Sequence, residues 1–299
     1  MILSFGEILY DIFPAYERLG GAPFNFVFHL HSFGFDSRLV SRVGDDERGR
    51  AVEAFFLRNH ITSDLLQRDP RHPSGTVRVR VDPAGVPDFT IVEDVAYDHI
   101  EAGDRLLRVL DEGPALIYFG TLAQRHPHSR STLHAILDRV GSALLLYDMN
   151  LRKNTFSREV IERSLAACHV VKLNDEELKI CRGLLGGEEN DDLFVKEMME
   201  RYRLEWVCLT RGAKGSALYH GDESFRTGSA RVPVMVDTVG AGDAYTAILA
   251  MGILRGWAPE LILDRAAEFA GAVCGLPGAV PDNGAFYRPY LTWKEADKR

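Results

Sequence analysis

Residues 143–173 read ALLLYDMNLRKNTFSREVIERSLAACHVVKL. An apolar run at 143–147 precedes an amphipathic stretch at 157–167, and a second apolar run follows at 170–173. Short β-rich runs that alternate with helices of about 10–15 residues indicate βαβ units and a mostly parallel sheet. The pattern continues on both sides, with strands expected at 115–119 and 206–210 and helices at 129–140 and 191–202. The sequence therefore predicts an α/β protein.

Residues 74–93 follow a different pattern. Thr76–Val81 alternate apolar and polar side chains with a period of two, as a strand with one solvated face does. The stretch 82–87 has the residues of a turn, and Phe89–Val92 can return as the partner strand. We expect this antiparallel hairpin to act as a lid over a binding site.

Composition and charge exclude several classes of protein. The chain has 299 residues, 46% of them hydrophobic, and 35 Lys+Arg against 43 Asp+Glu give a net charge of −8. This acidic balance argues against binding to nucleic acid or to an anionic membrane. Apolar runs fall short of the roughly 20 residues that a membrane span requires, and the N-terminus does not resemble a signal peptide. The four cysteines form no CxxC, which excludes a zinc ribbon and suits a reducing cytosol, so we expect a cytoplasmic protein.

Polar clusters follow three of the expected strands. They are Asp148-Met-Asn-Leu-Arg152, Asn174-Asp-Glu-Glu177 and Thr210-Arg-Gly-Ala-Lys-Gly215. Ligands of open α/β sheets bind outside the carboxyl ends of the strands. Each cluster alone can be a polar loop with a helix cap, but three at equivalent strand ends favour one shared pocket.

The strongest local signal is Asp237-Thr-Val-Gly-Ala-Gly-Asp243, which precedes a stretch with helical spacing of apolar residues. Glycines before a helix let backbone N–H groups converge, and the helix dipole adds positive potential, which together make an anion site. We expect Asp243 to be ionised at neutral pH there. An anion site beside a carboxylate suits phosphoryl transfer to a hydroxyl group, with the carboxylate accepting the hydroxyl proton. The alternative is that Asp243 only caps the helix.

Other well-known motifs are missing. The sequence contains no GxxxxGK[ST], and Phe5-Gly-Glu-Ile8 stands where a Rossmann dehydrogenase has GxGxxG. It contains no GxSxG and no His/Cys cluster with metal-ligand spacing. We expect the ten histidines to be surface groups or satisfied core groups.

The motifs together resemble those of the PfkB/ribokinase family of sugar kinases. Asp237–Asp243 is similar to the C-terminal signature of that family, and Gly20-Gly-Ala-Pro-Phe-Asn25 with Arg42-Val-Gly-Asp-Asp46 and Gly49 to its N-terminal signature. Asn174–Glu177 matches the NxxE motif of the family and Thr210–Gly215 its TxGxxG motif. The resemblance covers essentially the whole chain.

This resemblance implies a doubly wound, ribokinase-like fold with helices on both faces of the sheet. It implies a single domain over residues 1–299, with a lid from about 74–98 and a short segment near 8–20. ATP and Mg²⁺ would be the cosubstrates, and the acceptor would be a sugar hydroxyl group. Many relatives also bind a monovalent cation such as K⁺, and many dimerise through the lid.

The resemblance also assigns roles residue by residue. Asp243 would be the general base, with Gly240, Ala241 and Gly242 as the anion hole. Thr210, Gly212, Gly215 and Asn174 would line ATP, and Glu177 would organise Mg²⁺ together with Asn174 through water. Asp11, Gly20, Gly21 and Asn25 would face the sugar. Asp237, Val239 and Gly278 are the nearest matches to the monovalent-cation site.

The identity of the sugar stays open. Pro23 stands where ribokinases have a lysine, while Gly6–Asp11, Glu93–Asp98 and Asp148–Arg152 are similar to fructokinases, so D-fructose is the first expectation. The DxNxR element also occurs in 2-keto-3-deoxygluconate kinases, where an arginine suits an acidic sugar. Arg152 and Arg125 are the candidates for that contact. A ribokinase, a nucleoside kinase and a non-catalytic sugar sensor are further alternatives.

Overall fold

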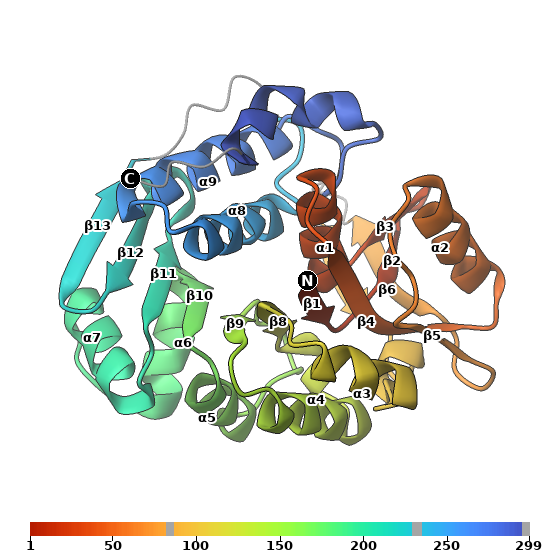
Figure 1. The fold of residues 1–299 in the computed structure, drawn as a ribbon, viewed down its shortest axis with the longest axis horizontal. Coiled ribbons are helices and arrows are strands. Elements are labelled where there is room, and N and C mark those ends of the chain that lie inside the picture. The colour runs from red at the N-terminus through yellow and green to blue at the C-terminus, as the bar shows by residue number, and fades with distance from the viewer. Residues whose placement is uncertain (82–86, 229–234, 295–299) are drawn as a thin grey trace.

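A nine-stranded sheet forms the centre of the protein (Figure 1). The structure, a computed structural model, describes residues 1–81, 87–228 and 235–294. In spatial order the strands are β13 (Glu223–Thr227), β12 (Ser216–His220), β11 (Trp206–Thr210), β10 (Val170–Asn174), β9 (Leu144–Asp148), β8 (Leu116–Gly120), β1 (Ile2–Phe5), β4 (Ser37–Gly44) and β5 (Leu66–Asp69). The seven strands from β11 to β5 run parallel, and β12 and β13 continue the sheet antiparallel.

Helices cover both faces of this sheet, which confirms the predicted doubly wound fold (Figure 1). One face packs against α1 (Ala22–Ser32), α2 (Glu47–Arg58), α8 (Ala241–Arg255) and α9 (Pro259–Val273). The other packs against α3 (Asp104–Asp111), α4 (Pro127–Arg139), α5 (Arg158–Ala167), α6 (Asp175–Leu185) and α7 (Asp191–Tyr202). Short 3₁₀ turns lie at η1 (Ala96–His99), η2 (Leu122–Gln124), η3 (Gly212–Lys214) and η4 (Gly284–Lys294).

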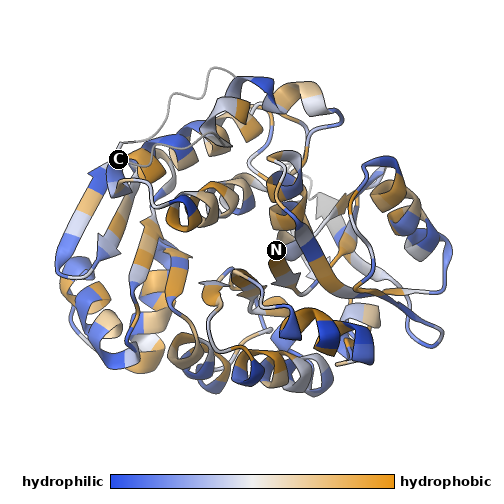
Figure 2. Cartoon of the chain, viewed as in Figure 1, coloured by the Kyte–Doolittle hydropathy of each residue, from blue (hydrophilic) through white to orange (hydrophobic). Residues whose placement is uncertain are grey.

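The central strands are apolar because they are buried on both sides. Along β8, Leu116 and Tyr118 belong to one core, and Ile117 and Phe119 to the core on the opposite face. Figure 2 shows hydrophobic residues along the strands and along α8, which lies between the sheet and α9. The uninterrupted apolar runs that the sequence shows at the strands from residue 115 onward are the signature of this two-sided burial.

A smaller sheet stands beside the large one. Its order is β3 (Glu17–Gly20), β2 (Leu9–Ile12), β6 (Gly75–Val81) and β7 (Pro87–Ile91). The β6–β7 pairing confirms the predicted hairpin, whose turn at 82–86 lies outside the described residues. The N-terminal pair β2–β3 joins it, with β2 parallel to β6. Three residues, Gly6–Ile8, connect β1 to this small sheet.

Two further findings bear on class. No helix among the described residues is long and apolar enough to cross a membrane. The four cysteines are buried free thiols.

Candidate functional site

The N-terminus of α8 is built around Gly240. This residue has φ 77°, and a β-carbon there would lie 2.3 Å from the Ala279 Cβ, so only glycine fits without displacing the loop at 279. Gly240 occupies the N-cap position of α8, and no side chain among the described residues caps the helix. The interpretation of Asp243 as a helix cap is therefore wrong. Ala241 N donates to the Thr238 carbonyl oxygen at 3.4 Å, and the other N–H groups of the first turn lie at a helix N-terminus of the kind that binds anions.

Asp243 lies in this first turn and is held by a residue that is far away in the sequence. Asn25 of α1 donates from Nδ2 to Asp243 Oδ2 at 2.7 Å. Burial raises the pKa of Asp243 to about 6, against the effect of this hydrogen bond. The group is still mostly ionised at pH 7, as predicted, but the expected reason is wrong. The site does not favour the charged form, because the cost of burying the carboxylate outweighs its local stabilisation.

Asn25 reaches this position because α1 begins at a strained turn. Gly21 has φ 112°, and a β-carbon there would lie 2.6 Å from the Glu7 carbonyl oxygen. The turn brings the start of α1 against the end of β1. The glycine pair predicted to face the sugar thus places Asn25 next to Asp243.

Lys172 is a site residue that the sequence analysis missed. It lies in β10, is 8% exposed, and its Nζ is 3.1 Å from Asp148 Oδ1. A β-carbon on Gly242 would be 3.2 Å from Lys172 Nζ, so the ammonium group lies against the first turn of α8. Although burial opposes its charge, the carboxylates around it raise the pKa of Lys172. A lysine inside the buried run Val170–Leu173 is the signal that could have identified it.

A cavity of about 490 Å³ opens from the other side of this turn. Its walls are mostly small or apolar, and they include Thr210, Gly212, Gly215, Met235, Ala241, Gly242, Tyr245, Ala267, Ala270 and Gly271. Gly215 has φ 86°, and a β-carbon there would overlap the carbonyl oxygen of Thr227. The cavity brings the TxGxxG residues to the anion site, and its shape and polarity fit an aromatic base that carries phosphates.

Asn174 and Glu177 form the N-terminal cap of α6. Asn174 Oδ1 accepts hydrogen bonds from the N–H groups of Glu176 and Glu177, and Glu177 Oε2 accepts one from Asn174 N at 2.8 Å. Glu177 Oε1 accepts another from Leu151 N at 2.9 Å. The capping alternative for this cluster is confirmed. The role of the pair at Mg²⁺ remains a prediction.

Carboxylates surround Arg152 on the side of the small sheet. Arg152 is exposed. Burial raises the pKa of Glu7, Asp11 and Asp243, and the positive charge of Arg152 partly offsets this rise. For Asp11, in β2, burial raises the pKa to about 6. A β-carbon on Gly20 would be 3.3 Å from Asp11 Oδ2, so the glycine leaves room for this carboxylate. Of the candidate sugar residues, Asn25 contacts Asp243, and the charge of Arg152 acts on both Asp11 and Asp243.

Glu7 is a second residue that the sequence analysis missed. It directly follows β1, is 3% exposed, and its Oε2 has no hydrogen-bond partner among the described residues. Burial raises the pKa of Glu7 to about 7. An acidic residue at the carboxyl end of a buried parallel strand was the available signal.

Arg125 is engaged elsewhere. Its guanidinium donates to both carboxylate oxygens of Asp98, at 2.8 and 2.7 Å, and to the Val92 carbonyl oxygen at 2.7 Å. It also lies over the ring of Tyr97. These contacts brace the segment that follows β7.

Asp237, Val239 and Gly278 lie close together, and their role at a monovalent cation remains a prediction. Asp237 accepts hydrogen bonds from Val239 N at 3.0 Å and from Gly278 N at 3.3 Å. Arg18 of β3 reaches the same loop, because a β-carbon on Gly278 would lie 2.5 Å from Arg18 Nη1. The small sheet therefore touches the loop that faces the start of α8.

Comparison with known proteins agrees with this arrangement. The family model for "pfkB family carbohydrate kinase" matches residues 5–283. A fructokinase from Klebsiella pneumoniae is 28% identical over 305 residues, which cover 95% of each chain. The crystal structure of an uncharacterized sugar kinase from Pyrococcus horikoshii in complex with ATP matches with a TM-score of 0.83 and 25% identity, covering 98% of this chain and 99% of that one. A fructokinase from Vibrio cholerae with bound fructose, ADP and potassium ion shares the fold, with a TM-score of 0.75 at 22% identity over 96% of this chain and 97% of that one.

The matched region begins at the end of β1 and extends beyond Gly278, so it contains the residues that converge at the start of α8. The chain is a member of the pfkB family of carbohydrate kinases.

Proposed function

We propose that this protein transfers the γ-phosphoryl group of ATP to a hydroxyl group of D-fructose. The observation that carries the proposal is the position of Asp243. Its carboxylate is held by Asn25 at the N-terminus of α8, whose first turn lines the apolar cavity, and the charge of Arg152 acts on it. We place the meeting point of the donor phosphate and the acceptor hydroxyl group there.

The residues divide the chemistry between them. Asp243 accepts the proton of the sugar hydroxyl group, whose oxygen then forms the new bond to phosphorus as the bond to ADP breaks. The N–H groups of Ala241 and Gly242 and the ammonium group of Lys172 stabilise the negative charge that develops on the transferred group. Mg²⁺ supplies further charge neutralisation when bound, and Glu177 with Asn174 would organise it through water.

The charge of the acceptor pocket favours a neutral sugar. Glu7, Asp11 and Asp243 contribute three carboxyl groups around a single arginine, Arg152. Burial already raises the pKa of all three, and a substrate carboxylate would add further negative charge, at a cost that one exposed guanidinium offsets only in part. The second arginine, Arg125, is already paired with Asp98. These contacts support fructose over an acidic sugar.

The exclusion of ribose is supported only indirectly. Pro23, which replaces the ribokinase lysine, is buried, and a β-carbon on Gly6 would lie 2.7 Å from its Cγ. Pro23 therefore packs under the turn and does not face the acceptor. It changes the pocket by removing a cation and by setting the start of α1.

Three further roles belong to the same proposal. The small sheet serves as a lid that excludes water when the sugar binds. Asp237, Val239 and Gly278 serve as the site of a monovalent cation, K⁺. Pairing of two small sheets would make a homodimer. Limited proteolysis with and without sugar, activity with and without K⁺, and light scattering test these three roles in turn.

A 2-keto-3-deoxygluconate kinase is the second candidate, because Arg152 is exposed and can form a bidentate pair with a carboxylate. Steady-state kinetics with D-fructose, 2-keto-3-deoxygluconate, D-ribose and nucleosides distinguish the candidates. We expect kcat/KM to be highest for D-fructose. A preference of tenfold or more for the keto acid, abolished in Arg152→Lys, would overturn the choice of sugar and leave the kinase assignment intact.

A further inference from the structure

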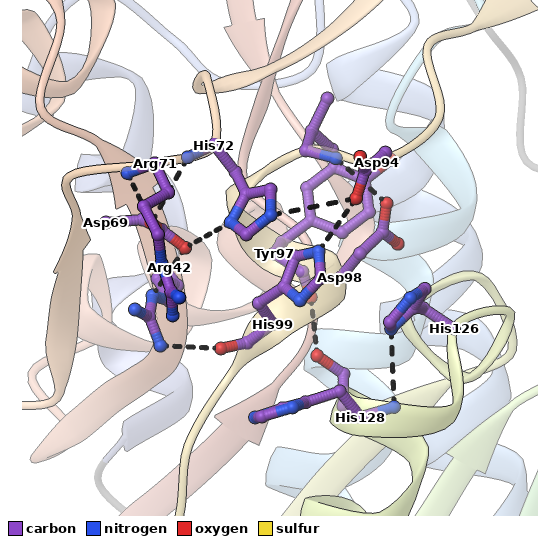
Figure 3. A network of polar contacts seen from close by, with 12 residues as sticks. Arg42, Asp69, Arg71, His72, Asp94, Tyr97, Asp98, His99, His126 and His128 are labelled. Carbon is purple, nitrogen blue, oxygen red and sulfur yellow. Dashed lines mark hydrogen bonds and ion pairs between the residues drawn. The ribbon is translucent and has the colours of Figure 1, made fainter.

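A group of histidines lies where the small sheet joins the large one (Figure 3). His72 lies in the connection from β5 to β6, and Asp94 and His99 follow β7, on the return to the large sheet. The rings of His126 and His128, at the start of α4, lie 4.5 and 5.7 Å from that of His99. No local pattern indicates the group in the sequence, because the residues are widely spaced along the chain.

Three of these residues present metal-ligand atoms to one another. One ligand atom each of His72, Asp94 and His99 lie within 4.8 Å of one another. Asp94 Oδ1 is 2.9 Å from His99 Nε2 and 3.8 Å from His72 Nε2. The side chains of His72 and His99 are 22% and 16% exposed, and that of Asp94 is 73% exposed. An ion from solvent can therefore reach all three.

Asp69 fixes the orientation of the first histidine. Its Oδ2 is 2.9 Å from His72 Nδ1, and its carboxylate also receives hydrogen bonds from the N–H groups of Arg71 and His72. Arg42 Nε lies 3.0 Å from the same oxygen, Asp69 Oδ2. An Nδ1–H that donates to this carboxylate leaves the Nε2 lone pair of His72 available to an ion on the side of Asp94. A carboxylate behind a histidine is the usual support of a metal-bound imidazole.

Asp94 is held in an uncommon backbone conformation. Its φ is 55°, a left-handed value that few non-glycine residues adopt outside turns and functional sites. In this conformation its Oδ1 lies within 3.8 Å of the Nε2 atoms of both His72 and His99. The backbone at this position thus directs a carboxylate toward both imidazoles.

We propose that His72 Nε2, His99 Nε2 and Asp94 Oδ1 bind one divalent transition-metal ion of the zinc class, with Asp69 as the support of His72. Two imidazoles and one carboxylate suit Zn²⁺ and leave a fourth position for water, whereas Mg²⁺ prefers oxygen ligands. The rings of His72 and His99 are stacked, with centroids 3.7 Å apart and planes 11° apart. Coordination turns one ring out of this stack, so that both lone pairs point to the ion.

An ion bound at this position would restrain the β6–β7 hairpin. It would connect the segment 70–74, which leads into the small sheet, with the segment 92–95, which leads out of it. Both ends of the β6–β7 hairpin would then be tied together at the edge of the large sheet. The metal would restrain the hairpin without touching the residues around Asp243.

The test titrates Zn²⁺ into the full chain, with any affinity tag removed, after treatment with a chelator and without nucleotide. Calorimetry should show one equivalent bound with a Kd in the micromolar range or below. His72→Gln and His99→Gln should each weaken binding at least tenfold, and Asp69→Asn by about 10–100-fold. His60→Asn, at an exposed histidine that follows α2, is the matched control and should bind as the wild type does.

Two measurements on the wild-type protein keep the test independent of the folding of the variants. X-ray absorption of the Zn²⁺ complex should show only nitrogen and oxygen neighbours, with an imidazole contribution at about 2.0–2.1 Å. Hydrogen exchange in 70–74 and 92–95 should slow when Zn²⁺ binds. The proposal would be overturned if His72→Gln and His99→Gln both bound Zn²⁺ as the wild type does. It would also be overturned if the variant with both substitutions bound Zn²⁺ as tightly as the wild type, or if Zn²⁺ left the hydrogen exchange of these segments unchanged. Protonation of the histidines without metal binding is the explanation that would then remain.

Discussion

At the scale of single residues, Asp243 combines two opposing requirements. It must be desolvated enough to act on a substrate hydroxyl group, yet it must remain ionised to accept the proton. A pKa raised to about 6 meets both, because the group is deprotonated at neutral pH and is a stronger base than an ordinary aspartate. The hydrogen bond from Asn25 orients the carboxylate and limits the rise.

Asp243→Asn should therefore lower kcat by roughly 10²–10⁴, the usual contribution of a positioned general base. The affinity for ATP should change little, since the side chains have nearly the same shape, and the melting temperature should not fall, because burial of the ionised carboxylate costs stability in the wild type. In the wild type, kcat/KM should fall as the pH drops through about 6, where Asp243 gains a proton. Steady-state kinetics over pH 5–8 check both points.

Asp222→Asn is the control for Asp243→Asn, because Asp222 is an exposed aspartate in the turn between β12 and β13. It should have the kinetics of the wild type. Retention of more than half of the wild-type kcat by Asp243→Asn, with chemistry shown to limit turnover, would remove the general-base role.

At the scale of elements, α6 shows what the sequence pattern contained and what was missed. The sequence analysis offered a helix cap as one reading of the cluster Asn174–Glu177, and an Asn followed three residues later by Glu is indeed a helix-start signal. Leu178, Cys181 and Leu185 then supply a buried face at helical spacing. The strands β2 and β3 carry no comparable local signal, since each has four residues and β2 pairs with β6, far away in the chain.

Glu177→Gln separates the two roles of this element. The glutamine amide keeps one acceptor oxygen and places an NH₂ group against a backbone N–H donor. We expect the free energy of unfolding to fall by about 1–2 kcal/mol. If the pair also organises Mg²⁺, the concentration of Mg²⁺ that gives half-maximal activity should rise.

Urea denaturation and Mg²⁺ titration of activity measure the two effects of Glu177→Gln. Glu176→Gln, an exposed neighbour in the same helical turn, is the matched control. A loss of stability with an unchanged Mg²⁺ titration would restrict Glu177 to capping.

At the scale of the whole molecule, the large sheet was predictable and the small details of the site were not. Apolar runs and helical periodicity are local signals, so the alternation from residue 115 onward already gave the architecture. The site depends on contacts between distant residues, such as Asn25 with Asp243 and Lys172 with Gly242. Such pairs leave no trace in spacing. The family motifs marked most of the positions, whereas Glu7 and Lys172 carried only the weaker signal of a charged residue at the end of, or inside, a buried strand.

The assembled site should also destabilise the protein at alkaline pH. The pKa of Glu7 is raised to about 7, and those of Asp11 and Asp243 to about 6. A carboxyl group with a raised pKa favours the folded state in its protonated form, and this contribution is lost as the pH rises through the folded-state pKa. For Glu7, the difference between 4.5 and about 7 corresponds to about 3 kcal/mol.

Glu7→Gln should accordingly be more stable than the wild type at pH 8, by up to about 3 kcal/mol, and similar to it near pH 5. Urea unfolding at both pH values measures the difference. Glu205→Gln, at an exposed position, is the control and should show no such dependence. If the free energy of unfolding of Glu7→Gln and of the wild type changed equally between the two pH values, Glu7 would ionise as freely in the folded protein as in the unfolded chain.

The interior position of β1 in the sheet has a consequence for folding during translation. This strand pairs with β4 on one side and with β8 on the other, so its second edge is covered only after residue 116 has left the ribosome. At about 5–20 residues per second, the wait after β1 itself is synthesised is roughly 5–20 s. During that time Ile2–Phe5 form an apolar strand with one open edge, which invites pairing with another nascent chain. Shielding of the nascent chain by chaperones therefore matters most while the segment between β4 and β8 is being translated.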